Sequence, residues 1–554
     1  MTKATLDEMV VRAPAPEPAV APALLRRRRL LVVLLLVVTG VSMVMAGGHS
    51  YAIDNEVQFQ TTRSLVNLRP DLTELDDGWA ARDDGPYRVR DDGTRVAIVP
   101  IGQSILSAPF YVASRAVAQL APSYQRDQFV RTGTFFTNSL LLGLTAVVVA
   151  LLAIELGATD RHGILLGYVY GLGTYALPNA KTYFTEIGAS LFVALACLLA
   201  ARAWQRGSTY LAAWSGVAVG AAFMVRPSSA LFVPVIGIVL AATLWRRHGF
   251  RRTLAPGLAY GVGAIAMIVV NGLFSWWRFG SPVDLGYQKV YQNYPLISGL
   301  TGQTWSLGKG LIFYAPIVLC SAIGAALAIR RRFALVAMLG GAAAASTIFF
   351  ARVPFWAGDN AWGPRYTLII VPLLVPLAAP ILALGWGRWA VRVTGVLGLL
   401  GALLGCMINF NATYILATRE IGVGGETPAI HNQLAWQPFV KQVEMLPEAF
   451  GDVVDADQVD EIDRGRYTRN SDADYGYFGA EPRIDVWWLW MGPTDASGYT
   501  WLFALPIVGL FAAAGYLLVR DRRIGQWDEA TASSADRYQS TSAVSSDGSP
   551  TSSI

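Results

Sequence analysis

Residues 26–46 read RRRRLLVVLLLVVTGVSMVMA: four arginines, then a run from Leu30 to Ala46 without a single charge. A helix needs roughly 20 apolar residues to cross a bilayer core of about 30 Å. Arginines before an apolar run also begin cleaved signal peptides, but Gly47-Gly48 is a poor cleavage site and many apolar runs follow. The stretch therefore predicts a membrane-spanning helix that starts in the cytoplasm.

The whole composition agrees with a chain buried in lipid. Hydrophobic residues make up 53% of the chain and charged residues 15%, whereas soluble domains have about 25% charged residues. The net charge of +5 comes with arginines that gather at the ends of apolar blocks. This placement suits membrane orientation better than nucleic-acid binding, so no nucleic-acid partner is expected.

The apolar blocks predict an all-α integral membrane protein, a multi-span bundle of about 12 helices. The expected spans are residues 30–46, 132–156, 163–180, 186–204, 209–225, 228–245, 255–275, 310–329, 333–351, 366–385, 391–410 and 499–519.

The arginines test this map, because loops on the cytoplasmic side carry the excess of positive charge. Every loop expected inside is basic, and both termini are expected in the cytoplasm. The inner arginines are Arg161, Arg202, Arg206, Arg246, Arg247, Arg251, Arg252, Arg330, Arg331, Arg332, Arg388 and Arg392, with Arg520, Arg522 and Arg523 after the last span.

The same map gives a domain organisation in the cell (plasma) membrane, with the active site expected on the outer face. Ile98–Leu120, interrupted by Pro100 and Pro109, is expected to lie along the outer interface, because an extra span would place the later arginines outside. The divisions are a disordered tail (1–25), a transmembrane catalytic module (26–410) with outer loop 47–131, an outer region (411–498), the last helix (499–519) and a disordered tail (520–554).

Neither the cysteines nor the histidines indicate a metal site. The three cysteines lie inside apolar blocks without a CxxC partner, and the four histidines are scattered without ligand spacing. We interpret the cysteines as small buried residues.

Two carboxylates, Asp54 and Glu56, follow the first span closely. They are either the solvated start of a loop or a general base at the membrane surface, able to take a proton from an acceptor hydroxyl. Sequence physics alone leaves both interpretations open.

Three further outer segments concentrate charge beside the membrane. Lys181 and Glu186 share a very short loop, where the lysine either holds a phosphate or snorkels, and the glutamate either assists a base or favours a helix N-terminus. Arg226 breaks the positive-inside pattern, and its planar fork suits phosphate. Arg352 and Arg365 flank Trp356 and Trp362, which fit either sugar recognition or an interfacial aromatic belt; the remaining candidates are Lys309 and Tyr366.

These segments, taken in order, resemble glycosyltransferases of the GT-C superfamily that use polyprenyl-phosphate sugars, close to the protein O-mannosyltransferase and aminoarabinose-transferase group. The resemblance covers about residues 30–410. It rests on Asp54-Asn55-Glu56, Pro100-Ile101-Gly102, Ala108-Pro109-Phe110, Thr185-Glu186, Arg226-Pro227, Arg278-Phe279-Gly280-Ser281-Pro282, Gly308-Lys309-Gly310, Tyr314-Ala315-Pro316 and Trp362-Gly363-Pro364-Arg365-Tyr366.

The resemblance implies an inverting transfer from a polyprenyl-phosphate sugar, with Asp54 as the base that deprotonates an acceptor hydroxyl. It implies catalytic roles for Asp54, Glu56 and Glu186. Lipid-phosphate and sugar binding would fall to Lys181, Arg226, Lys309, Arg352, Trp362, Arg365 and Tyr366. Asn55 leaves open whether Glu56 shares the work or binds a divalent metal; no cofactor or metal is assumed, because such donors do not generally need one.

The sugar and the acceptor stay open: mannose and arabinose both fit the resemblance, and the acceptor is a cell-envelope glycan, a lipid or a protein. The rival hypothesis is a polytopic transporter or lipid flippase. Transporters tend to show internal repeats and polar sites at the midplane, whereas here no repeat is found and the unusual charges lie at the outer boundary. A non-catalytic membrane scaffold is a third alternative.

Overall fold

The computed structural model describes residues 20–50, 53–72, 86–123, 126–286, 292–358, 361–384, 389–410, 486–490, 501–520 and a few positions between 433 and 444. The chain divides into two compact units. One comprises residues 1–33 and 511–554. The other, Leu34–Leu510, contains every site discussed below.

The expected multi-span helical bundle is confirmed. In the part of the chain that is described, seven helices are long and apolar enough to cross a membrane: Arg126–Glu155, Glu186–Arg206, Pro227–His248, Phe250–Phe279, Val318–Ala351, Arg365–Leu382 and Trp501–Arg520. Thr209–Val225 and Gly395–Met407 are shorter apolar helices. The last expected helix thus begins and ends within two residues of its predicted bounds.

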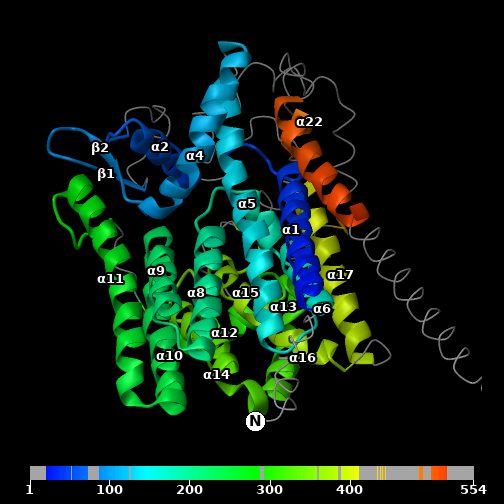
Figure 1. Ribbon diagram of the computed structural model, residues 1–554. Coiled ribbons are helices and arrows are strands. Elements are labelled where there is room, and N and C mark those ends of the chain that lie inside the picture. Colours follow the sequence, from blue (N-terminus) through cyan, green and yellow to red (C-terminus); the bar gives the residue numbers. More distant parts are fainter. Residues whose placement is uncertain are drawn as a thin grey trace, which may run out of the picture. The chain divides into compact units, whose positions relative to one another are not determined.

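The elements follow one another in the order that the spans predict (Figure 1). They are α1 (Val20–Val44), α2 (Ile53–Val66), β1 (Tyr87–Val89), β2 (Arg95–Ala97), α4 (Ile101–Val117), η3 (Ala118–Leu120), α5 (Arg126–Glu155), α6 (Asp160–Leu172), α7 (Ala176–Ala180), α8 (Glu186–Arg206), α9 (Thr209–Val225), η5 (Pro227–Leu231), α10 (Phe232–His248), α11 (Phe250–Phe279), α12 (Leu296–Trp305), α13 (Leu311–Tyr314), α14 (Val318–Ala351), η6 (Arg365–Ile370), α15 (Val371–Leu374), η7 (Val375–Ala378), α16 (Ala379–Leu382), α17 (Trp389–Phe410) and α22 (Trp487–Trp490).

Four expected spans are not single straight helices. The span 163–180 is α6 followed by the short α7, with Gly173–Tyr175 between them. The span 366–385 is a series of short 3-10 and α segments, because Pro372, Pro376 and Pro380 each remove a backbone donor. Spans 310–329 and 333–351 meet in α14, which is kinked where Arg332 leaves the helical conformation.

The interrupted segment Ile98–Leu120 forms helix α4, with its polar face turned inward. Gln103, Ser104 and Ser107 are fully buried, whereas Ile105 and Val112 are exposed. A helix with apolar side chains outside and polar ones inside suits a lipid-facing position. Pro109 sits within it. The structure therefore supports the expected helix; its depth relative to a bilayer stays a prediction.

The long loop after α1 contains the one departure from an all-helical fold within the described residues. Strands β1 and β2 pair antiparallel, with Arg88 opposite Val96. This hairpin lies beside the C-terminal end of α11, at the end of the helices that also carries α2 and α4 (Figure 1). Arg278 donates from NH1 to the carbonyl oxygens of Ala97 and Val99, both at 2.7 Å.

The same end of the bundle carries a buried aromatic cluster. Phe135 of α5 stacks on Tyr183 with ring centroids 4.5 Å apart, and Phe59 of α2 lies 6.1 Å from Phe135. Trp487 of α22 donates from its indole nitrogen to the carbonyl of Met43 at 2.8 Å. The cluster thus joins α2, α5, the loop before α8 and one short segment from the predicted outer region 411–498, most of which falls outside the described residues.

Candidate functional site

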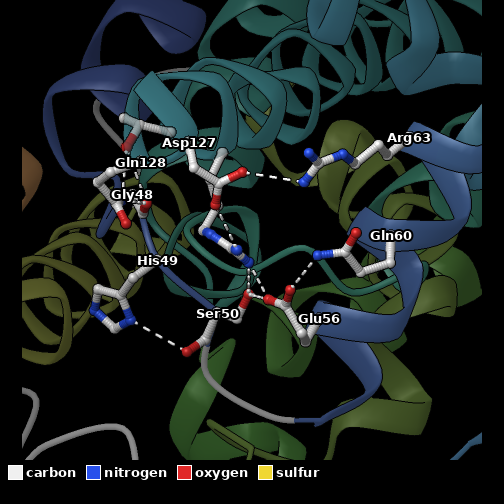
Figure 2. A network of polar contacts seen from close by, with 10 residues as sticks. Gly48, His49, Ser50, Glu56, Gln60, Arg63, Asp127 and Gln128 are labelled. Carbon is white, nitrogen blue, oxygen red and sulfur yellow. Dashed lines mark hydrogen bonds and ion pairs between the residues drawn. The ribbon is translucent and has the colours of Figure 1, made fainter. Parts of the chain in front are cut away.

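The predicted acid Glu56 is the centre of a buried charged network (Figure 2). It lies in the first turn of α2, where the helix dipole favours a carboxylate. Ser50 donates to its Oε2 at 2.9 Å and Gln60 donates to its Oε1 at 2.8 Å. Arg131 of α5 forms an ion pair with the same Oε2, and both side chains are over nine-tenths buried.

The network continues outward along α5. Arg131 NH2 lies 3.1 Å from Asp127 Oδ2, and Asp127 Oδ1 lies 3.2 Å from Arg63 of α2. The guanidinium of Arg131 also sits 4.4 Å above the Phe59 ring. Two arginines and two acids therefore balance one another between α2 and α5.

Asp54, the predicted base, lies one helical position before Asn55 in the same first turn of α2. Its side chain is partly exposed, unlike those of Asn55 and Glu56, which are buried. A partly exposed carboxylate can meet a substrate hydroxyl, which a base must do before it can take a proton.

A second charged cluster forms around Glu186, the first residue of α8. Its Oε1 lies 2.7 Å from Arg226 NH1 and 3.1 Å from Arg365 Nε. Only 2% of the glutamate side chain is exposed, against 14% and 12% for the two arginines. Because a guanidinium keeps its proton in proteins, the two cations exceed the one carboxylate by one positive charge.

The other oxygen of Glu186 has no hydrogen-bond partner among the described residues. This oxygen, Oε2, is buried. Buried acceptors are nearly always paired, so an unpaired one at a charged cluster suits a ligand hydroxyl.

Aromatic rings surround the two arginines. Arg226 lies 5.2 Å from the Tyr366 ring centroid, and Arg365 lies 4.5 Å from that of Phe184. Tyr366 stacks on Phe350 with centroids 4.8 Å apart. Rings on either side keep water from the guanidinium groups and so strengthen their attraction for an anion.

Glycines shape the loop that delivers Arg365. Gly358 and Gly363 have φ angles of +80° and +66°, which side chains other than glycine rarely adopt. A Cβ on Gly358 would lie 2.8 Å from Cβ of Arg365, and one on Gly363 would lie 2.9 Å from the Tyr314 ring. The loop therefore needs glycine at both positions.

Two predicted lysines lie in neighbouring segments and are buried. Lys309 donates from Nζ to the carbonyl of Ala361, next to Trp362. Asn179 of α7 donates to the carbonyl of Trp362 at 3.3 Å, and Lys181 follows directly after α7. The segments that carry Lys181, Lys309 and Arg365 are thus hydrogen-bonded to one another.

Trp362, predicted to bind sugar, and Arg352, predicted to bind phosphate, are held by protein contacts outside the Glu186 cluster. Trp356 and Trp362 are completely buried in protein, so neither forms part of an exposed aromatic belt. Arg352, at the end of α14, donates from NH2 to the carbonyl of Gln292 at 2.9 Å. In the described structure Arg352 therefore holds the chain before α12.

Polar side chains connect α2 and α4 with the loop that precedes Glu186. Tyr183 and Thr62 of α2 share a hydrogen bond of 2.9 Å. Gln103 of α4 donates to Asn138 of α5 at 2.8 Å, and Asn138 donates to the carbonyl of Thr182 at 2.7 Å. Burial raises the pKa of the Tyr183 phenol, although the hydrogen bond with Thr62 opposes the shift, so Tyr183 is neutral.

Sequence reasoning missed Arg131, Asn138 and Gln103. Arg131 was placed at the end of an outer loop, because it directly precedes the apolar block that was expected to begin at residue 132. A signal for them was available: Thr132, Thr134, Thr137 and Asn138 are polar residues inside an otherwise apolar helix, and such groups need partners.

No group of three or more His, Cys, Asp or Glu side chains that could hold a metal ion occurs among the residues described. The carboxylates are instead paired with arginines, as in the Glu56 and Glu186 clusters.

No protein-family model and no curated protein matches the chain. Among solved structures, the chain is similar to the crystal structure of ArnT from Cupriavidus metallidurans bound to undecaprenyl phosphate, with 14% sequence identity and a TM-score of 0.41. The similarity covers 78% of this chain and 80% of that chain, and the bound undecaprenyl phosphate is a property of the ArnT structure.

Proposed function

We propose that this protein is a membrane glycosyltransferase that moves a sugar from a polyprenyl-phosphate donor to an acceptor hydroxyl on the outer face of the membrane. The observation that carries the proposal is the Glu186 cluster, in which Arg226 and Arg365 share one carboxylate oxygen. This arrangement places two cations among aromatic rings, which suits a leaving phosphate.

In the proposed reaction, Asp54 takes the proton of the acceptor hydroxyl. The resulting oxygen attacks the anomeric carbon from the face opposite the phosphate, so the configuration inverts. The bond between that carbon and the phosphate oxygen breaks, and the electron pair leaves with the polyprenyl phosphate. Arg226 and Arg365 stabilise the negative charge that grows on the phosphate.

The burial of each residue supports its proposed role. Asp54 is partly exposed at a helix start, where a hydroxyl can reach it. Arg226 and Arg365 are mostly shielded from water, where an ion pair with phosphate is stronger than in bulk solvent. Mannose and arabinose remain the candidate sugars, and a glycan, a lipid or a protein the candidate acceptor.

The experiment supplies membranes that contain the protein with radiolabelled polyprenyl-phosphate mannose and polyprenyl-phosphate arabinose in parallel. Label should move to an acceptor in parent membranes, and Asp54→Asn should reduce the rate by roughly 10²–10⁴-fold, the range of general base catalysis. The matched control is Asp92→Asn, an exposed acid of the same loop, which should transfer at the parent rate.

Two results count against the proposal. Full activity in Asp54→Asn removes Asp54 as the base. Label that crosses the membrane but never leaves its lipid carrier favours a flippase.

A further inference from the structure

Both carboxylate oxygens of Glu56 accept from protein donors. Gln60 occupies Oε1, while Ser50 and Arg131 occupy Oε2. A carboxylate that is paired with a buried guanidinium and accepts from two further side chains is held in a fixed position. The geometry of Glu56 therefore suits a positioning role.

The partner, Arg131, is itself held rigidly. Besides Glu56, it contacts Asp127 at 3.1 Å and Ser50 Oγ at 3.2 Å. Its guanidinium plane also packs on Phe59, and only 8% of its side chain is exposed. Arg131 projects from the long helix α5, so whatever binds to it is fixed relative to the bundle.

What Arg131 holds is the chain on both sides of Asp54. Ser50 precedes Asp54 by four residues and Glu56 follows it by two, and both contact the same guanidinium (Figure 2). A second anchor lies just before, where Gln128 and Thr132 of α5 donate to the carbonyl of Gly48 at 2.6 and 2.9 Å.

We propose that Glu56 and Arg131 are positioning residues that set the place of Asp54, with Glu56 acting through Arg131 and not on the substrate. This proposal rests on the proposed function, which makes Asp54 the base. A displacement of about 1 Å at a reacting group can cost about 10²-fold in rate. A rigid attachment of the first turn of α2 to α5 removes that freedom.

The test is a set of variants assayed for sugar transfer with the donor identified above: Glu56→Gln, Arg131→Gln and the double variant. If the two residues work as one unit, each single variant lowers kcat by about 10- to 100-fold while KM for the donor changes by less than about threefold. The double variant then loses no more than the worse single variant, because one unit cannot be lost twice.

A second arm repeats Arg131→Gln in the Asp54→Asn background. If Arg131 acts through Asp54, it has no further effect on the remaining rate. The proposal is overturned if Glu56→Gln loses more than about 10³-fold while Arg131→Gln keeps the parent rate, or if the losses multiply in the double variant.

Folding is measured by thermal unfolding of each purified variant. If Arg131→Gln does not fold, Arg131→Lys, which keeps the charge but loses the fork geometry, takes its place in both arms. The matched control is Arg69→Gln, which breaks the pair with Asp71 after the end of α2, outside this network, and should transfer at the parent rate. An inactive parent protein contradicts the proposed function, whereas an active parent with multiplying losses contradicts only the positioning role.

Discussion

Replacing Glu186 by glutamine should have two opposite effects that the geometry of its cluster predicts together. The substitution keeps the shape of the side chain but removes the one negative charge that Arg226 and Arg365 share at 2.7 and 3.1 Å. Two mostly buried guanidinium groups then lose the carboxylate that they share. A ligand phosphate can replace the lost charge.

The first effect is on stability. Removing one partner of a buried ion pair typically costs about 3–5 kcal/mol, because it leaves an uncompensated charge inside the protein. Glu186 is buried, and the two arginines, with 14% and 12% of their side chains exposed, are mostly shielded from water. Glu186→Gln without ligand should therefore unfold at a clearly lower temperature than the parent.

The second effect is on phosphate binding. A phosphate held by both arginines would lie roughly 5 Å from the Glu186 carboxylate, where repulsion between unit charges at an effective dielectric of about 20 is about 3 kcal/mol. That energy corresponds to a gain in phosphate affinity of about 100-fold, which is an upper bound. The product, polyprenyl phosphate, should thus bind more tightly to Glu186→Gln than to the parent.

Thermal unfolding in detergent, with and without added undecaprenyl phosphate, measures both effects. The added lipid should raise the midpoint of Glu186→Gln more than that of the parent, since a ligand of the native state stabilises in proportion to its affinity. The control is Asp91→Asn, which removes one negative charge at an exposed position of the loop between β1 and β2 and should match the parent. An unchanged midpoint together with a smaller ligand shift in Glu186→Gln would refute the reasoning.

Three further predictions concern stability. Trp487→Ala should lower the free energy of unfolding by about 3–5 kcal/mol, because a buried indole and its hydrogen bond to α1 are lost together. A decrease below about 1 kcal/mol, measured by thermal unfolding, would contradict this packing. Gly102→Ala should destabilise by about 1–3 kcal/mol, because the new Cβ would lie 2.5 Å from the backbone of α9, whereas Gly340→Ala, which meets nothing within 4 Å, should be neutral or stabilising. Burial alone would raise the pKa of Asp284, but hydrogen bonds from the Gly286 amide and Arg88 outweigh it, so the pKa lies below its ordinary value. The stabilisation that results is present above the pKa of the unfolded chain and disappears as the pH falls through the pKa of the folded protein. Asp284→Asn should therefore be less stable than the parent at about pH 7 and equal to it at about pH 2.

The helical bundle was predictable because its signals are local. The length of an apolar run decides whether a helix can cross a bilayer, and that length is read from residues next to one another in the sequence. The expected helix over Ile98–Leu120 was found as α4, since its alternation of serines and apolar residues already contained the two faces. The breaks in 366–385 were less obvious, although Pro372, Pro376 and Pro380 explain them afterwards.

The site was predictable only as a set of unusual charges. Glu186, Arg226 and Arg365 were each singled out because charge next to a span is costly. The sequence did not predict that Arg226 and Arg365 share one oxygen of Glu186. They lie 40 and 179 positions after it, and no local rule connects residues so far apart. Nor did the sequence indicate that Trp362 would be buried in protein, since an aromatic belt and a packed core use the same residue.

The sequence by itself thus determined the class of protein, the order of its helices and the short list of acids and cations, because hydrophobic length and isolated charge act along the chain. Only the tertiary structure decided the partners. Arg131 looked like the end of a loop until α5 brought it against Glu56, and nothing in the sequence indicated that Ser50, Gln60 and Arg131 would all donate to the oxygens of Glu56. The physical reason is that a buried charge is defined by what neutralises it, and neutralisation depends on packing between distant segments.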